Sequence, residues 1–377
     1  YKLSLVFLAN NWVALISVLL AFMSPVLIYY TPNFNPDPAS MGMALLGWYF
    51  FYKILRSANK SAYIFLFSCM AIASLLKVTS LISTIAMLCL IVLDYIKQLY
   101  PGKRQLKHPF LLGSLLVLSV LTTYAWYHYA NWLSEREQAY FFTTSVPWPK
   151  SLEQAYTLFM EILSNWITAY YFPVFYLVLL VSIVYLFIHR AIANRLLLLT
   201  TLLLYLGGIA FFCIFIVQYR GHDYYIIALL PAVFFHLLCL AELLKNQFLG
   251  SKLLQLTSYA LVLCSVAYCL IHSYERYHYK WYIDATYGDH VTAEKYNDIE
   301  PYLRSIGIQR TDKVFSLFDM SPIITLYLMN QPGEVAIWNK PEKEIAACFK
   351  RSDFKYFIIN NESFYTVADY KPYLIKE

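Results

Sequence analysis

Hydrophobic residues gather in long runs along this chain, and short polar gaps separate the runs. A bilayer core of about 30 Å needs roughly 20 apolar residues per spanning helix, and runs of this kind recur. The pattern predicts nine helices, at residues 11–30, 40–56, 62–77, 78–95, 109–128, 171–189, 195–217, 225–242 and 253–272. The third and fourth are short and meet at Lys77, as in a broken or re-entrant pair. We therefore expect an all-α polytopic membrane domain over residues 1–272.

The pattern changes after about residue 273, where charged residues return. It predicts helices around 292–306 and at 321–329, and strands at 313–318, 334–337 and 356–359. Strands that alternate with helical runs indicate a small α/β unit with a partly parallel sheet. We therefore expect residues 273–377 to form a second, water-soluble domain.

Composition and charge agree with a membrane protein. The chain is 60% hydrophobic and 14% charged, whereas soluble domains are about one quarter charged. The net charge of +6 does not indicate nucleic-acid binding, because the basic residues occupy alternate gaps between the predicted spans. They are Lys2, Lys53, Arg56, Lys60, Lys97, Lys103, Arg104, Lys107, Arg190, Arg195, Lys245 and Lys252. If all nine segments span, these gaps share one side, which the positive-inside bias makes cytoplasmic. The C-terminal domain is then extracytoplasmic.

The long gap at residues 129–170 lies on the opposite side. It mixes Trp148 and Trp166 with acidic residues such as Glu153 and Glu161. A segment of this composition is typical of helices that lie flat on a membrane surface.

Ionisable side chains at the ends of membrane spans are costly, so they are candidates for function. Asp37 lies in an Asn-Pro-Asp-Pro loop just before a predicted helix, and the alternative role for it is a helix N-cap. Lys77 interrupts a long apolar run. A snorkelling lysine is the alternative there, but a cation in this place suits a lipid phosphate.

A third candidate site lies between two strongly apolar spans. Arg220, His222 and Asp223 fall within four residues and are followed by Tyr224. Arginine binds phosphate bidentately, and histidine donates or accepts a proton near neutral pH. The cluster therefore favours a polyanionic headgroup site, with an Arg220–Asp223 surface ion pair as the alternative. Solvated helix faces account for the acidic and basic residues of 135–161 more simply than catalysis does.

No nucleotide-binding glycine loop and no metal-ligand spacing is present in the sequence. The activated substrate must then arrive from elsewhere, and a lipid-linked donor that carries its own leaving phosphate fits this requirement. No cofactor is indicated with certainty. A divalent metal stays possible, because the carboxylates of Asp37 and Asp223 are oxygen ligands of the right kind.

Four features together resemble a known family. They are Ser24-Pro25 followed by the loop at 35–38, the short helix pair around Lys77, the segment 222–225 leading into Leu229-Leu230-Pro231, and the C-terminal domain. In their order, over residues 5–275, they resemble the polyprenyl-phosphate-dependent glycosyltransferases of the GT-C fold. This group contains the protein O-mannosyltransferases and the aminoarabinose transferase of lipid A.

The resemblance implies transfer of a sugar, with inversion, from an undecaprenyl- or dolichyl-phosphate carrier to a lipid, glycan or protein acceptor. It implies that Lys77, Arg220 and His222 contact the carrier phosphate, with Asp223 and Tyr224 in the same donor site. Asp37 is then the acidic residue of the second outer loop. In this family the main catalytic carboxylate lies in the first outer loop, and no residue here corresponds to it. Because the chain begins at Tyr1 without Met, we expect that either an N-terminal part is missing or Asp37 serves as the base.

Other functions compete with this interpretation. A transporter or flippase of lipid-linked sugars is the main one, but inverted repeats and ionisable residues near the midplane are typical of transporters. An O-antigen ligase or polymerase is a second, although the 129–170 stretch is acidic rather than rich in Arg and His. The transferase is the leading prediction, placed in a bacterial inner membrane.

Overall fold

A computed structural model covers the chain. The structure describes residues 1–33, 35–57, 60–100, 102–136, 147–279, 298–319, 324–337 and, between 345 and 359, all but 346, 349 and 352. The chain divides into two compact units, Tyr1–Glu275 and Arg276–Glu377.

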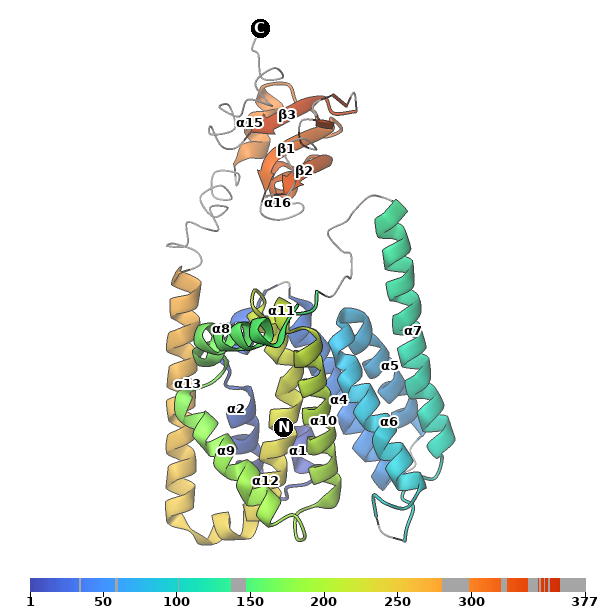
Figure 1. Ribbon diagram of the computed structural model, residues 1–377, viewed down its shortest axis with the longest axis vertical. Helices are drawn as coiled ribbons and strands as arrows, with labels where there is room; N and C mark the ends of the chain where they lie inside the picture. Colours follow the sequence, from blue (N-terminus) through green and yellow to red (C-terminus); the bar gives the residue numbers. More distant parts are fainter. Residues whose placement is uncertain are drawn as a thin grey trace. The chain divides into compact units, whose positions relative to one another are not determined.

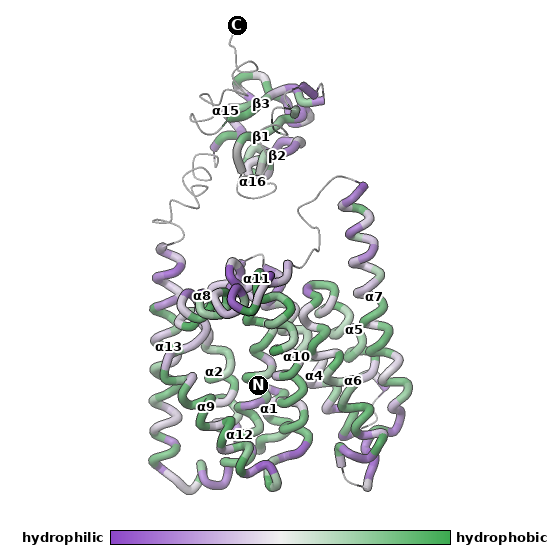
Figure 2. Tube along the Cα trace, in the orientation of Figure 1, coloured by the Kyte–Doolittle hydropathy of each residue, from purple (hydrophilic) through white to green (hydrophobic). Residues whose placement is uncertain are grey.

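The first unit is helical (Figure 1). Its elements are α1 (Lys2–Leu5), α2 (Asn11–Phe22), α3 (Pro25–Tyr30), α4 (Pro36–Arg56), α5 (Lys60–Leu76), η1 (Val78–Ser80), α6 (Leu81–Tyr95), α7 (Pro109–Arg136), α8 (Leu152–Tyr170), α9 (Pro173–Ile188), α10 (Arg195–Ile214), α11 (Ile216–Tyr219), η3 (Asp223–Leu229), α12 (Leu230–Gly250) and α13 (Lys252–His278). Hydrophobic residues cover most of the length of these helices (Figure 2).

Among the described residues, five helices are long and apolar enough to cross a membrane: Val78–Tyr95, α7, α10, Asp223–Gly250 and α13. A sixth span results if α8 and α9, which are bent by 102° from one another, are taken as one. The apolar helices α2 and α5 are shorter. The unit is thus a helical membrane domain, as predicted, and the number of nine spans stays a prediction.

The predicted helix at 11–30 is wrong in one respect, because it is broken into α2 and α3. Ser24 has extended backbone angles (φ −115°, ψ 120°), and Pro25 opens the next helix. Proline lacks the N–H that a continuous helix needs, so the break falls just before it. Likewise α7 extends to Arg136 rather than ending at residue 128. The stretch predicted to lie flat on the membrane contains α8, which crosses the direction of α9 (Figure 1).

Helices α4 and α5 form an antiparallel pair that positions the site. Their packing is close, because a Cβ at Gly47 would collide with the Met70 side chain. Trp48, Phe51 and Tyr52 of α4 are almost completely buried in the same core. Since α4 and α5 run in opposite directions, the first turn of α4 meets the end of α5.

The second unit contains α15 (Ile299–Ser305), β1 (Val314–Asp319), α16 (Ile324–Met329), β2 (Gly333–Ile337) and β3 (Tyr356–Ile359). The strands form one sheet in the order β2-β1-β3, and β1 pairs in parallel with both neighbours. Two apolar clusters hold this sheet, one around Phe315, Leu317 and Ala336 and one around Val314 and Met329. The three predicted strands are confirmed, and within the described residues of this unit both strand pairs are parallel. Residues 292–297 and 321–323 of the two predicted helices lie outside the described residues.

Candidate functional site

Asp37 is fixed in the first turn of α4. Asn35 caps this helix, because its side-chain Oδ1 accepts a hydrogen bond of 2.9 Å from the Asp37 backbone N–H. The N-cap role considered for Asp37 therefore belongs to Asn35. The Asp37 residue is only 3% exposed. A carboxylate in the first turn of a helix is stabilised by the partial positive charge of the helix N-terminus.

Lys77 joins α5 to η1 and faces Asp37. Its backbone is extended (φ −153°, ψ 121°), so the predicted break between two short helices falls at this residue. The Lys77 Nζ lies 3.0 Å from Asp37 Oδ2, and its side chain is 20% exposed. The same ammonium lies over the rings of Tyr224, at 5.1 Å, and Tyr225, at 5.0 Å. Lys77 is thus held by a buried ion pair and two cation–π contacts and does not reach away to solvent.

Asp223 and Tyr30 link two distant segments next to this pair. Tyr30, the last residue of α3, donates a hydrogen bond of 2.9 Å from its hydroxyl to Asp223 Oδ1. Asp223 is 3% exposed at the start of η3. The Tyr30 ring also meets the Tyr224 ring edge to face, with centroids 5.2 Å apart. The contact therefore fixes the start of η3, which places Tyr224 and Tyr225 beside Lys77.

His222 stands at the exposed edge of this group. Its ring lies against the rings of Tyr224 and Tyr225, with centroids 5.3 and 5.4 Å away. Partial burial against these rings lowers the pKa of His222 below its ordinary value, and the positive charge of Lys77 lowers it further. Asp223 acts in the opposite direction on the pKa. His222 consequently gains its proton at a lower pH than an ordinary histidine.

Arg220 has a different partner from the one considered for it. Its Nε lies 2.8 Å from Glu161 Oε2 of α8, and the Arg220 side chain is 62% exposed. Trp166 of α8 donates from Nε1 to the backbone oxygen of Arg220 at 3.3 Å. The alternative Arg220–Asp223 ion pair is absent from the described contacts of Arg220. Of the six predicted residues, the structure brings Asp37, Lys77, His222, Asp223 and Tyr224 into one group and leaves Arg220 at its edge beside α8.

The hydroxyls of Ser40 and Ser80 connect the helix that carries Asp37 to the segments on either side of Lys77. Ser40, one turn after Asp37, donates to the Ala73 carbonyl oxygen at 2.7 Å, and its Oγ lies 2.5 Å from Ser80 Oγ. Ala73 precedes Lys77 by one turn and Ser80 follows it by three residues. The Ser40 contacts therefore tie the first turn of α4 to both sides of Lys77.

The sequence did not single out Tyr30, Ser40, Ser80 or Glu161 as site residues, and Tyr225 entered only as part of the segment 222–225. Tyr225 directly follows the predicted cluster and was within reach of the same argument. The others depend on contacts between distant segments, and a serine inside an apolar helix carries no signal of its own. Within the described residues, no group of three or more His, Cys, Asp or Glu side chains is arranged to hold a metal ion.

Comparison with known protein families gives a match for the first part of the chain. Residues 3–127 match the model of the dolichyl-phosphate-mannose-protein mannosyltransferase family. The match covers about a third of the chain, includes Asp37 and Lys77, and ends before α8 and the 219–225 segment. No curated protein and no solved structure matches the chain. Together with the apolar helices, the match indicates an integral membrane glycosyltransferase that uses a lipid-linked sugar donor.

Proposed function

We propose that this chain transfers a sugar from a polyprenyl-phosphate carrier to an acceptor on the extracytoplasmic face of a bacterial inner membrane. The observation that carries the proposal is the buried ion pair of Asp37 and Lys77, which lies inside the region that matches the mannosyltransferase family. The acceptor is a lipid, a glycan or a protein. The extracytoplasmic side is proposed because the basic residues lie in the gaps on the other side of the predicted spans.

Lys77 is suited to receive the leaving phosphate. Negative charge develops on the carrier phosphate as the bond from the sugar C1 to the phosphate oxygen breaks, and a fixed cation lowers this barrier. Asp37, Tyr224 and Tyr225 hold the ammonium in place before the donor arrives. The exposed fifth of the Lys77 side chain is the surface that a phosphate can approach.

Donor binding then changes the state of Asp37. A phosphate that engages Lys77 competes with Asp37 for the same ammonium, so the carboxylate becomes a stronger proton acceptor. In the transfer, the acceptor oxygen forms a bond to C1 and its proton passes to the Asp37 carboxylate. The electron pair of the broken bond leaves with the phosphate, which stays on the carrier lipid. Attack from the face opposite the phosphate inverts the anomeric carbon.

A flippase of lipid-linked sugars is the second candidate function. Transporters place their polar groups near the bilayer midplane. The Asp37–Lys77 group instead lies at one end of α4, a helix of 21 residues. This position favours chemistry at a membrane surface over movement across it.

The test measures donor consumption by purified protein with radiolabelled polyprenyl-phosphate sugars. Wild type is expected to release carrier phosphate. Arg220→Ala is expected to reduce turnover about 10- to 100-fold, the loss of a charge-assisted phosphate contact. Glu161→Ala removes only the exposed ion-pair partner of Arg220 and is expected to change turnover less than about fivefold.

Two outcomes contradict this proposal. An equal loss in Arg220→Ala and Glu161→Ala means that Arg220 only anchors α8 and does not contact the donor. If wild type consumes no donor but moves a lipid-linked sugar across reconstituted vesicles, the flippase function replaces the transferase.

His222 gives a pH-dependent prediction. The donor phosphodiester stays charged across the neutral and mildly acidic range, whereas His222 gains a proton at a lower pH than an ordinary histidine, because its pKa is lowered. A protonated His222 adds a second positive charge near the phosphate. We expect the KM for the donor to fall as the pH is lowered through this range in wild type and to vary little in His222→Gln. Parallel pH profiles of KM in the two proteins refute a contact between His222 and the phosphate.

A further inference from the structure

A polar cavity of about 280 Å³ lies at the end of α4 that is opposite Asp37. Four segments that are far apart in the sequence line it: the turn after α1, the end of α4, the α6–α7 loop and the start of α10. The lining residues are Phe7, Tyr52, Leu55, Arg56, Tyr100, Gln105, Asn194 and Leu196. None of these eight described residues is acidic, and Arg56 brings a positive charge, so the cavity is suited to an anion.

Arg56 is oriented without being neutralised. One of its guanidinium nitrogens, Nη2, donates to the Val6 backbone oxygen, and the group lies over the Phe7 ring at 5.7 Å from the centroid. Within the described part of the chain, Arg56 has no carboxylate partner. A guanidinium has five N–H donors, and this geometry leaves several of them for a ligand. Its charge therefore remains available for an anion in the cavity.

The opposite wall of the cavity is also held in place. Asp94, which is 1% exposed, accepts hydrogen bonds of 3.0 Å from the backbone N–H groups of Gln105 and Leu106. Leu99 and Leu106 of the same loop are buried. The α6–α7 loop is thus anchored on both sides of Tyr100, and the hydroxyl of Tyr100 and the amide of Gln105 are neutral groups of the lining that can donate to an anion.

The position of the cavity relative to the membrane and its mixed polar and apolar lining point to a lipid ligand. Arg56 follows Asp37 by 19 positions in one helix, a rise of about 28 Å. This rise is close to the thickness of the hydrocarbon core, so, with α4 taken as a span as the sequence predicts, Arg56 lies at the opposite membrane surface from Asp37. Phe7, Leu55 and Leu196 add an apolar wall next to the polar groups. We propose that the cavity binds the phosphate of an anionic phospholipid headgroup, with its apolar wall against the glycerol and the first acyl carbons.

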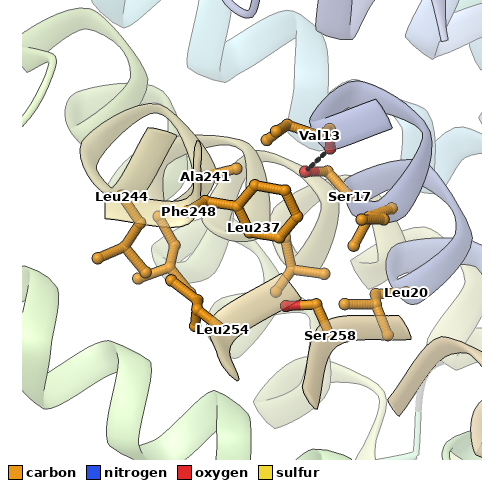
Figure 3. Close-up of a pocket in the computed structure, with 11 residues that line it drawn as sticks. Val13, Ser17, Leu20, Leu237, Ala241, Leu244, Phe248, Leu254 and Ser258 are labelled. Carbon is orange, nitrogen blue, oxygen red and sulfur yellow. Dashed lines mark hydrogen bonds between the residues drawn. The ribbon is translucent and has the colours of Figure 1, made fainter. Parts of the chain in front are cut away.

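A second cavity in the same unit shows the contrast. It measures about 90 Å³ and lies among α2, α12 and α13, where apolar side chains dominate (Figure 3). The hydroxyl of Ser17 already donates to the Val13 oxygen at 2.8 Å. This cavity offers hydrocarbon contacts but no charge, whereas the Arg56 cavity combines both.

The experiment measures lipid binding to the purified full chain by native mass spectrometry and by thermal unfolding. The probes are phosphatidylglycerol, phosphatidylcholine, sn-glycerol 3-phosphate and inorganic phosphate. Wild type is expected to bind phosphatidylglycerol in preference to the other three. Arg56→Gln is expected to weaken this binding about tenfold, and Arg56→Lys is expected to recover part of it. Arg190→Gln is the matched control, because Arg190 is exposed and does not line the cavity.

Three results would overturn the proposal. Equal binding of phosphatidylcholine and phosphatidylglycerol to wild type means that the cavity does not read headgroup charge, and this comparison needs no variant. Equal losses in Arg56→Gln and Arg190→Gln mean that surface charge in general attracts the lipid. If inorganic phosphate or glycerol phosphate binds as tightly as the lipid, the site takes a soluble anion.

Discussion

Lys77→Gln and Asp37→Asn are each expected to reduce sugar transfer by at least about 100-fold, the cost of losing a preorganised charge at the developing transition state. Lys77 is the group that meets the leaving phosphate, and Asp37 both holds Lys77 and accepts the acceptor proton. The two side chains are 3.0 Å apart, and Asp37 is almost completely buried. Turnover of a polyprenyl-phosphate sugar, measured in saturating donor, checks this expectation.

Loss of activity in a single variant also has a structural explanation, which the double variant tests. Removing one partner of a buried ion pair leaves an uncompensated charge and costs about 3–5 kcal/mol of stability. Asp37→Asn combined with Lys77→Gln removes both charges and keeps both shapes. We expect the double variant to regain thermal stability relative to the single variants and to stay inactive. A double variant that regains both stability and turnover shows that the pair only holds the fold.

The part of the site that lies within short segments was predictable. Asp37 before a helix, Lys77 inside an apolar run and the cluster at 220–224 each carry a local signal, because an ionisable group at the end of a membrane span is costly. The break at Lys77 follows from the same pattern. The contact between Asp37 and Lys77 was not predictable. The two residues are 40 positions apart, and the packing of α4 against α5 decides the distance between them.

Arg220 shows why local proximity misleads. Its nearest acidic residue in the sequence is Asp223, which suggested a pair between them. In the structure Asp223 points to Tyr30 of α3, and Arg220 takes Glu161 of α8. The choice depends on where α8 and α3 pack, and neither position can be derived from the sequence around residue 220.

The fold shows the same division between local and distant causes. The strands of the second unit follow from short apolar runs, and the parallel pairing of β1 with β2 follows from the helix α16 between them. The break between α2 and α3 has a local cause in Pro25, yet an apolar run through it reads as one span. Hydrophobicity marks the residues that enter the membrane, whereas the backbone chemistry of single residues decides where a helix ends.

Asp223→Ala is expected to reduce kcat/KM for the donor about 100-fold, chiefly by raising KM. Asp223 and Tyr30 hold the start of η3 against α3, and this contact places the Tyr224 and Tyr225 rings over Lys77. A misplacement of about 1 Å at a reacting group can cost roughly 100-fold in rate. The effect on KM arises because Lys77, without the Tyr224 and Tyr225 rings against its ammonium, is no longer held in the position that binds the phosphate.

Two milder variants separate position from charge at this contact. Asp223→Asn keeps an oxygen that accepts from Tyr30, whereas Tyr30→Phe removes the hydroxyl and keeps the ring. If Asp223 acts by position, Tyr30→Phe is expected to lose about tenfold, the value of one hydrogen bond to a charged group, and Asp223→Asn to lose less. If Asp223→Asn is as inactive as Asp223→Ala while Tyr30→Phe keeps full turnover, the negative charge itself is required. Asp223 then acts directly on the reacting groups, and the positioning role assigned to the Tyr30 contact is wrong.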